Sequence, residues 1–141
     1  MREHLVNLAL KLVGCPYIWG GTNPWVGFDC SGFVVWIYQV FGLLPSGDWT
    51  AQGLYNHFVA AGTNFEPMRD RGGLVFYGKS TRQITHVMVS VEPRLVVGAS
   101  GGDHTCLTLE DARRRGAQVK VKPTRYRNDV VAAVHVPFPG E

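Results

Sequence analysis

Residues 16–38, PYIWGGTNPWVGFDCSGFVVWIY, contain the change from loop to buried element around which we expect the fold to form. The first half is rich in glycine, proline and tryptophan, which predicts a loop with packed aromatic side chains. The second half, from Cys30 onward, is apolar nearly all round and predicts an element of the core. Its length favours a helix, capped by Asp29 and stopped by Gly42, whereas its β-branched residues favour a strand.

The sequence on either side of this stretch predicts helices first and strands afterwards. Apolar residues at helical spacing indicate a helix over residues 2–13, which Gly14 and Pro16 end. Thr50 suits the N-cap of a short helix that ends near residues 61–62. Short β-rich runs then follow at residues 74–77, 86–91, 95–97, 119–122 (an edge strand) and 130–136 (a buried one), with about one helical turn at 111–116. This order predicts an α+β domain with an antiparallel sheet, not an alternating βαβ fold.

Length and composition exclude several classes of protein. With 141 residues, the chain fits a single domain over residues 1–141. Its 45% hydrophobic content rules out a disordered polymer, and no stretch approaches the roughly 18 apolar residues of a membrane span. A net charge of +3 is too small to argue for a nucleic-acid partner. The N-terminus has no apolar leader, so we expect no secretory signal.

Cys30 is the first candidate for a reactive residue because it begins the predicted helix. The positive end of a helix favours the thiolate, which is the nucleophilic form of cysteine. Cys15 lies at a predicted helix C-terminus and Cys106 in a strand-like stretch, so we interpret both as packing residues. The alternative is that Cys30 is also a small buried hydrophobic residue. A zinc site is not supported, because the C-x₂-C and H-x₃-H spacings are missing.

A cysteine nucleophile needs a general base close in space, and the sequence offers two histidines in suitable places. His86 follows Thr85 and opens a predicted strand, where its ring can project into a cleft. His104 follows the glycine-rich turn at residues 100–103, which could return the chain alongside His86. The other histidines are interpreted as surface or core residues: His4, His57 and His135.

Four segments resemble motifs of the NlpC/P60 cysteine peptidases, in the order in which that family has them. Residues 16–38 resemble the nucleophile motif, P-Y-x-W-G-G followed by F-D-C-S-G-F, and residues 85–91 resemble the histidine strand H-V-x-I-Y. Residues 72–77 resemble the strand G-D-L-V-F-F, and residues 49–52 resemble R-T-S/A-x-Q. The resemblance covers roughly residues 5–100, and its first motif is highly specific.

The resemblance implies a circularly permuted papain-like fold, in which helices carry the cysteine and an antiparallel sheet carries the histidine. It implies hydrolysis of amide bonds in peptidoglycan stem peptides, at or near γ-D-glutamyl linkages, without a metal or cofactor. Cys30 matches the nucleophile and His86 the base. Tyr17 matches a tyrosine that lines the site and helps to hold the oxyanion. Asp29 and Ser31 match positions that contact the free amino end of the stem peptide.

The chain departs from the family pattern in two places. The family often has a histidine that orients the base, and Gly98 stands at that position. We expect His104 to take the orienting role, with Asp103 as second choice, although both could be solvated turn residues. Gly73 replaces the aspartate of G-D-L-V-F-F, which puts the local strand structure in doubt more than catalysis.

Two other hypotheses keep the fold and change the function. One is an amidase or acyltransferase acting on a non-wall substrate. The other is a non-catalytic phage tail module, for which the missing histidine is the argument. For a wall peptidase without a signal peptide, we expect delivery by a phage particle, by lysis or by a non-Sec route, and contact with phage tail proteins. A late basic cluster is either a solvated face or a site of attraction to an anionic envelope: Arg113, Arg114, Arg115, Lys120, Lys122, Arg125 and Arg127.

Overall fold

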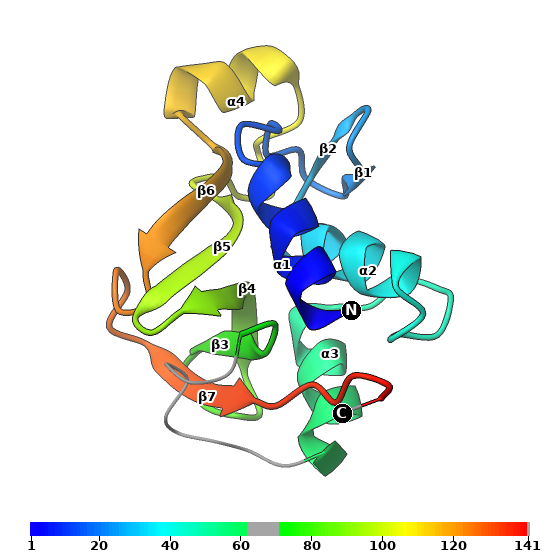
Figure 1. Ribbon diagram of the computed structural model, residues 1–141. Helices are drawn as coiled ribbons and strands as arrows, with labels where there is room; N and C mark the ends of the chain where they lie inside the picture. The colour runs from blue at the N-terminus through cyan, green and yellow to red at the C-terminus, as the bar shows by residue number, and fades with distance from the viewer. Residues whose placement is uncertain (62–70, 141) are drawn as a thin grey trace.

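The computed structural model describes residues 1–61 and 71–140, and it confirms an α+β domain. The first three helices lie on one side of an antiparallel sheet, and the last helix lies apart from them (Figure 1). The helices are α1 (Arg2–Lys11), α2 (Cys30–Val40), α3 (Ala51–Phe58), the short 3₁₀ helix η1 (Val59–Ala61) and α4 (Leu109–Arg115). The strands are β1 (Thr22–Asn23), β2 (Gly27–Phe28), β3 (Leu74–Gly78), β4 (Ile84–Glu92), β5 (Leu95–Ser100), β6 (Gln118–Pro123) and β7 (Val130–Val134).

The predicted buried element is a helix, and its two ends explain why. The Asp29 carboxylate caps α2 by accepting a hydrogen bond from the Gly32 N–H at 2.8 Å. At the other end Gly42 has a φ of 71°, a conformation in which glycine stops a helix without strain. Phe33, Val34 and Ile37 between these ends are fully buried. The caps and the burial therefore decide in favour of the helix over the strand.

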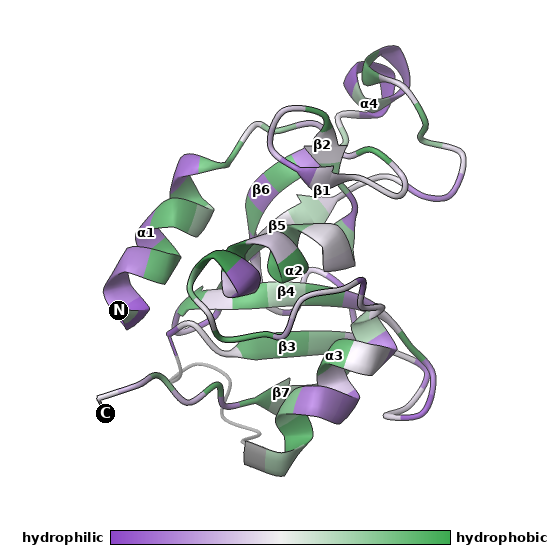
Figure 2. Ribbon diagram, turned by 90° about the vertical axis from the view of Figure 1, so that its right-hand side faces the viewer, coloured by the Kyte–Doolittle hydropathy of each residue, from purple (hydrophilic) through white to green (hydrophobic). Residues whose placement is uncertain are grey.

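The five-stranded sheet has the order β6-β5-β4-β3-β7, with every neighbouring pair antiparallel. Its central strand β4 contacts both α2 and α3, and β5 contacts α2 as well. Figure 2 shows hydrophobic colour on α2 and on the strands it faces. The main core lies between these helices and the sheet, while a smaller cluster around Tyr77 and Met88 is packed separately. Cys30, the first residue of α2, lies near the beginning of β4, with its sulfur 4.0 Å from the Thr85 carbonyl oxygen.

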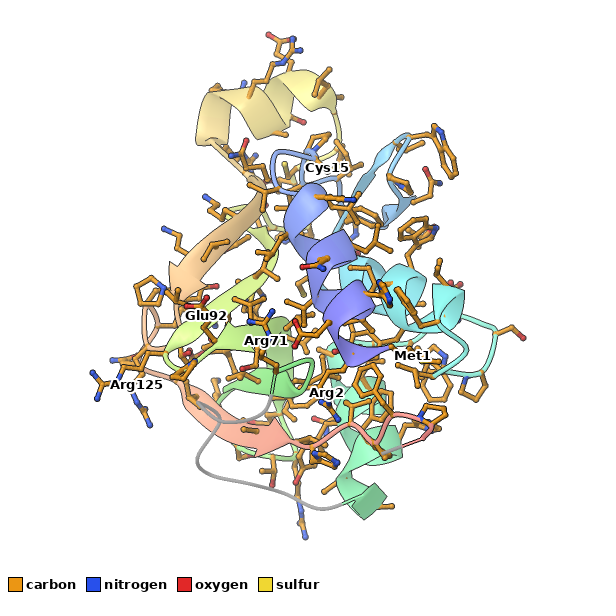
Figure 3. All side chains as sticks on the ribbon, in the orientation of Figure 1. Met1, Arg2, Cys15, Arg71, Glu92 and Arg125 are labelled. Carbon is orange, nitrogen blue, oxygen red and sulfur yellow. The ribbon has the colours of Figure 1, made fainter. Side chains whose placement is uncertain are left out.

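Besides the apolar face that α1 buries in the main core, charged side chains join this helix to the rest of the domain. Arg71 binds the Glu3 carboxylate through two nitrogens, at 3.0 and 2.9 Å. Arg2 donates to the Val136 carbonyl oxygen at 3.0 Å, and its guanidinium lies over the Phe138 ring. Figure 3 shows Arg2 and Arg71 on the side of α1 that faces the sheet. These contacts join the N-terminus to the chain that enters β3 and to the chain that leaves β7.

Several predicted boundaries differ from the observed ones. Helix α1 ends at Lys11, because the next residues form a turn, whereas the sequence predicts a helix to residue 13. Strand β4 begins at Ile84, so His86 lies inside the strand, opposite Tyr77 and beside an irregularity in the β3–β4 pairing. Strand β3 forms even though Gly73 replaces an acidic residue, and the Gly73 carbonyl accepts from Ser90 N–H. The expected helix end at residue 62 lies outside the described residues.

Candidate active site

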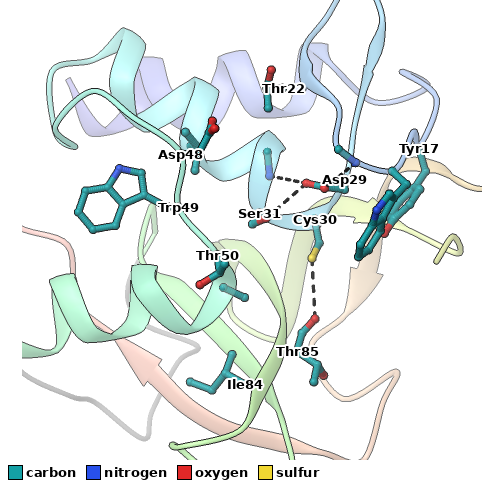
Figure 4. Close-up of a pocket in the computed structure, with 15 residues that line it drawn as sticks. Tyr17, Thr22, Asp29, Cys30, Ser31, Asp48, Trp49, Thr50, Ile84 and Thr85 are labelled. Atoms are coloured by element: carbon teal, nitrogen blue, oxygen red, sulfur yellow. Dashed lines mark hydrogen bonds between the residues drawn. The ribbon is translucent and has the colours of Figure 1, made fainter. Parts of the chain in front are cut away.

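Cys30 is the first residue of α2, and its thiol faces the backbone of β4. The sulfur lies 4.0 Å from the carbonyl oxygen of Thr85 (Figure 4). The Asp29 carboxylate holds the surrounding loop by accepting from Gly20 N–H at 3.0 Å and from the Ser31 hydroxyl at 3.3 Å, besides capping the helix. The predicted cap is therefore confirmed, and the same side chain fixes the loop on one side of the sulfur.

Cys30 lies where two pockets meet. The larger, of about 470 Å³, lies between the N-terminal ends of α2 and α3 (Figure 4) and includes Ser31 and Asp48 in its lining. The smaller, of about 240 Å³, is lined by His86 and by the turn that follows β5. Four residues line both pockets: Tyr17, Trp19, Cys30 and Thr85. A linear substrate can thus extend into a compartment on each side of the sulfur.

His86 is 6% exposed, and its ring is held by a tyrosine that the sequence did not single out. Its Nε2 atom lies 2.7 Å from the hydroxyl oxygen of Tyr126, which in turn lies 3.1 Å from the hydroxyl of Ser100. The rings of Tyr77 and His86 are 5.2 Å apart. Tyr126 belongs to the connection between β6 and β7, 40 residues from His86. Only the sheet pairing brings these two segments together, so no local pattern could reveal the contact.

His104 and Asp103, which the sequence suggested as groups that orient His86, have other partners in the structure. Both residues line the smaller pocket with His86, as the turn geometry suggested. The Asp103 carboxylate, however, accepts from Thr105 and from Arg115 at 2.9 Å, and these partners lower the pKa of Asp103 to about 2. The exposed His104 ring meets the Trp19 ring edge-on at 6.2 Å. Among the described residues, the side-chain hydrogen bond to His86 comes from Tyr126.

Tyr17 and Ser31 line the larger pocket together with Cys30. The Tyr17 ring lies so close to Gly102 that a Cβ atom at position 102 would overlap it. Burial, with the nearby Cys30 and Asp29 groups adding to it, raises the pKa of Tyr17. Its hydroxyl therefore stays protonated at neutral pH and can donate a hydrogen bond into the pockets.

The surroundings of Cys30 oppose the ionisation that its place at a helix N-terminus favours. Burial raises the pKa of the Cys30 thiol to about 11, and the Asp29 carboxylate adds to the rise. Backbone N–H groups of Val87, Ser31 and Cys30 itself favour the thiolate and oppose this effect without overcoming it. Burial also lowers the pKa of His86 to about 3, with Arg127 lowering it further. These pKa directions favour a neutral thiol and a neutral imidazole in the resting pair over a thiolate–imidazolium pair.

These pKa directions predict slow alkylation of Cys30 at neutral pH. Only the thiolate reacts, so the rate constant with iodoacetamide should rise about tenfold per pH unit from about pH 7 and level off only near pH 11. The measurement is mass spectrometry of alkylated protein in a Cys15→Ala/Cys106→Ala background, where Cys30 is the sole thiol. A fast rate that does not change between about pH 5 and 8 would contradict it, because that plateau marks a thiolate–imidazolium pair.

The other two cysteines are packing residues, as the sequence predicts. Cys106 is fully buried and its thiol donates to the Tyr17 carbonyl at 3.3 Å, while Cys15 packs against the main core. All three cysteines are free. Within residues 1–61 and 71–140, no three His, Cys, Asp or Glu side chains are placed to hold a metal ion. The same part of the chain has no helix that is long and apolar enough to cross a membrane.

The late basic residues do not form one uniform positive face. Arg114 pairs with Asp111, Arg115 with Asp103, and Arg127 with Asp129 through two contacts at 2.9 and 2.7 Å. Lys120 donates to the Gly116 carbonyl, and Lys122 lies 5.6 Å from the centre of the Tyr126 ring. Because intramolecular partners engage most of the cluster, the solvated-face interpretation is the better supported one.

Comparison with known proteins gives consistent similarities. A model described as "NlpC/P60 family" matches residues 14–126. The chain is 41% identical over 92 residues to the bifunctional muramidase/DL-endopeptidase CwlT of Bacillus subtilis, covering 63% of this chain and 26% of that protein. It is 47% identical over 74 residues to the murein DD-endopeptidase MepH of Escherichia coli, covering 51% of this chain and 26% of that protein. The chain thus spans about a quarter of the length of these relatives.

Solved structures show the same fold over nearly the whole chain. The NlpC/p60 domain of the peptidoglycan hydrolase SagA has a TM-score of 0.68 at 29% identity, covering 95% of this chain and 97% of that domain. The peptidoglycan hydrolase RipB of Mycobacterium tuberculosis has a TM-score of 0.72 at 23% identity, covering 97% of this chain and 65% of that one. The expected fold class is therefore confirmed.

Proposed function

The chain belongs to the NlpC/P60 family, and from this premise we propose that it is a cysteine peptidase that hydrolyses amide bonds in the stem peptides of bacterial peptidoglycan. The proposal assigns Cys30 as nucleophile and His86 as base. The observation that carries it is the position of the Cys30 thiol at the helix N-terminus, between two pockets, with His86 lining the smaller one. The endopeptidase names of the relatives support the substrate class.

The two pockets give the substrate a direction. The base must hand its proton to the leaving amine, so the leaving side of the peptide belongs in the smaller pocket beside His86. The acyl side then lies in the larger pocket with Asp29 and Ser31. This agrees with the family role of those two positions at the free amino end of a stem peptide, because the amino end belongs to the acyl part.

The reaction can start from the neutral pair. His86 removes the thiol proton as the Cys30 sulfur attacks the carbonyl carbon, so charge develops in the transition state instead of in the resting enzyme. The backbone N–H groups at the start of α2 and the protonated Tyr17 hydroxyl can donate to the oxyanion. The C–N bond then breaks, the imidazolium protonates the leaving amine, and water activated by His86 hydrolyses the thioester to a carboxylate.

Digestion of purified sacculi tests the proposed function. The expected result is release of stem-peptide fragments with new amino ends, identified by mass spectrometry, which also names the scissile bond. Cleavage of a small γ-glutamyl amide with no release from sacculi would favour an amidase on a non-wall substrate. Turnover of neither substrate would favour a non-catalytic module. Delivery by a phage particle and contact with tail proteins are finer proposals that rest on the sequence alone.

A further inference from the structure

We propose that Tyr126 is the positioning residue that orients His86, in the place of the histidine that many family members have at the position of Gly98. The inference rests on the proposed function, because it concerns how the base assigned there is held. Tyr126 lines neither pocket, so it acts through His86 and not on the substrate.

The Met88 side chain occupies the space beside Gly98, and a larger residue there would have to displace it. A Cβ atom there would lie 2.6 Å from the Met88 sulfur and 3.5 Å from the Met88 methyl carbon, so methionine already fills the space beside the strand. Met88 is fully buried in the smaller cluster, against which Tyr126 also packs. The group that contacts the His86 ring comes instead from another segment, the β6–β7 connection.

Neighbouring groups hold the Tyr126 side chain, so that it can fix the orientation of the His86 ring. Its backbone N–H donates to the Pro123 carbonyl at 2.9 Å, and the centre of its ring lies 5.8 Å from that of Tyr77. The Tyr77 hydroxyl donates to the Thr124 carbonyl at 2.8 Å, which ties the same connection to β3. The sheet therefore holds both the imidazole and the phenol, and the 2.7 Å contact between them does not depend on a mobile surface side chain.

The hydrogen-bond chain is compatible with two tautomers of His86, and only one of them leaves a base for Cys30. If His86 Nε2–H donates to the Tyr126 oxygen and the Tyr126 hydroxyl donates to Ser100, the free lone pair lies on Nδ1. That nitrogen can then take the Cys30 proton. The reverse direction places the proton on Nδ1 and leaves no base for the thiol. The proposal is therefore that Tyr126 accepts from Nε2 and keeps His86 in the Nε2–H tautomer.

The test is Tyr126→Phe, which keeps the ring and removes the hydroxyl. We expect kcat on sacculi to fall about 10- to 100-fold, as losses of groups that orient a histidine typically do, with KM changed less than about twofold. In ¹⁵N spectra of the histidine side chains, His86 should change from the Nε2–H tautomer to a mixture of both. Tyr55→Phe is the matched control, since Tyr55 packs on Phe76 at 5.4 Å and lines neither pocket.

The spectrum makes this inference separable from the proposed function, because it needs no substrate. If the parent protein does not digest sacculi but Tyr126→Phe alters the His86 tautomer, the proposed substrate fails and the positioning role stands. An unchanged Nε2–H tautomer in a folded Tyr126→Phe protein would overturn the inference, whether or not kcat falls. Unchanged kcat in a variant of an active parent would overturn it as well.

Discussion

Cys30→Ala is expected to abolish hydrolysis while leaving the domain folded. Without the sulfur no thioester can form, so kcat should fall by about 10⁴-fold or more, as in other enzymes that lose their nucleophile. The fold should tolerate the change, because Asp29 and not Cys30 caps the helix, and the thiol has only a weak 4.0 Å contact with the Thr85 carbonyl. We expect the free energy of unfolding to change by less than about 1 kcal/mol.

The matched control for this experiment is Cys15→Ala. Cys15 is also a free, partly buried cysteine, but it follows the end of α1 and lines neither of the two pockets. Its variant should keep the parent turnover, measured as fragments released from sacculi. Hydrolysis by Cys30→Ala at the parent rate would show that Cys30 is not the nucleophile. Thermal unfolding of all three proteins shows whether any loss of activity comes from loss of the fold.

The sequence predicted the nucleophile end of the site because that information is local. Asp29, Cys30 and the apolar run after them define a capped helix within about a dozen residues, and the structure places the thiol at its first turn. The ionisation state of the Cys30 thiol could not be predicted from the local sequence. It depends on burial and on the Asp29 carboxylate, which both raise the pKa of the thiol and oppose the effect of the helix N-terminus.

The sequence predicted the base end of the site only in part, because some of the information needed there is not local. His86 lies in a strand with a recognisable pattern, but its partner lies 40 residues further on, in a connection with no motif. The turn before Asp103 does return to the smaller pocket, as expected. Which side chain from that region is used depends on where α4 places Arg115, which engages the Asp103 carboxylate. Such choices follow from tertiary packing and cannot be read from spacing.

Gly32→Ala should be the most destabilising of the small substitutions near the site, although alanine is the better helix former. A Cβ atom at Gly32 would overlap the carbonyl oxygen of Gly21 and lie 2.9 Å from the Asp29 carboxylate. That carbonyl accepts the Asp29 N–H at 3.2 Å, and Asp29 in turn accepts the Gly32 N–H. The overlap can be relieved only by moving the loop away from the helix, which breaks the hydrogen bond from Asp29 N–H to Gly21 and disturbs the Asp29 cap.

A comparison of the free-energy terms predicts that Gly32→Ala lowers the stability of the domain. Alanine gains about 1 kcal/mol over glycine in helix propensity. Overpacking typically costs about 1–3 kcal/mol and loss of a helix cap about 1 kcal/mol or more, and here the obstacle is backbone. We expect a net loss of about 2–3 kcal/mol and a melting temperature lower by roughly 6–12 °C. Hydrolysis should also fall, because the same movement displaces Cys30 and the wall of the larger pocket.

Gly53→Ala provides the comparison, because Gly53 occupies the same third position of its helix, α3, after the N-cap Thr50. The Gly53 N–H donates to the Thr50 hydroxyl at 3.0 Å, just as the Gly32 N–H donates to Asp29. A Cβ atom at Gly53 would meet only side-chain atoms, at 3.3 Å from the Thr50 hydroxyl oxygen and 3.7 Å from the Trp49 ring. Its variant should therefore stay within about 1 kcal/mol of the parent. Equal melting temperatures for the two variants would show that the Gly21 carbonyl does not require a glycine at position 32. The close approach of loop and helix would then not explain why glycine follows Cys30 and Ser31.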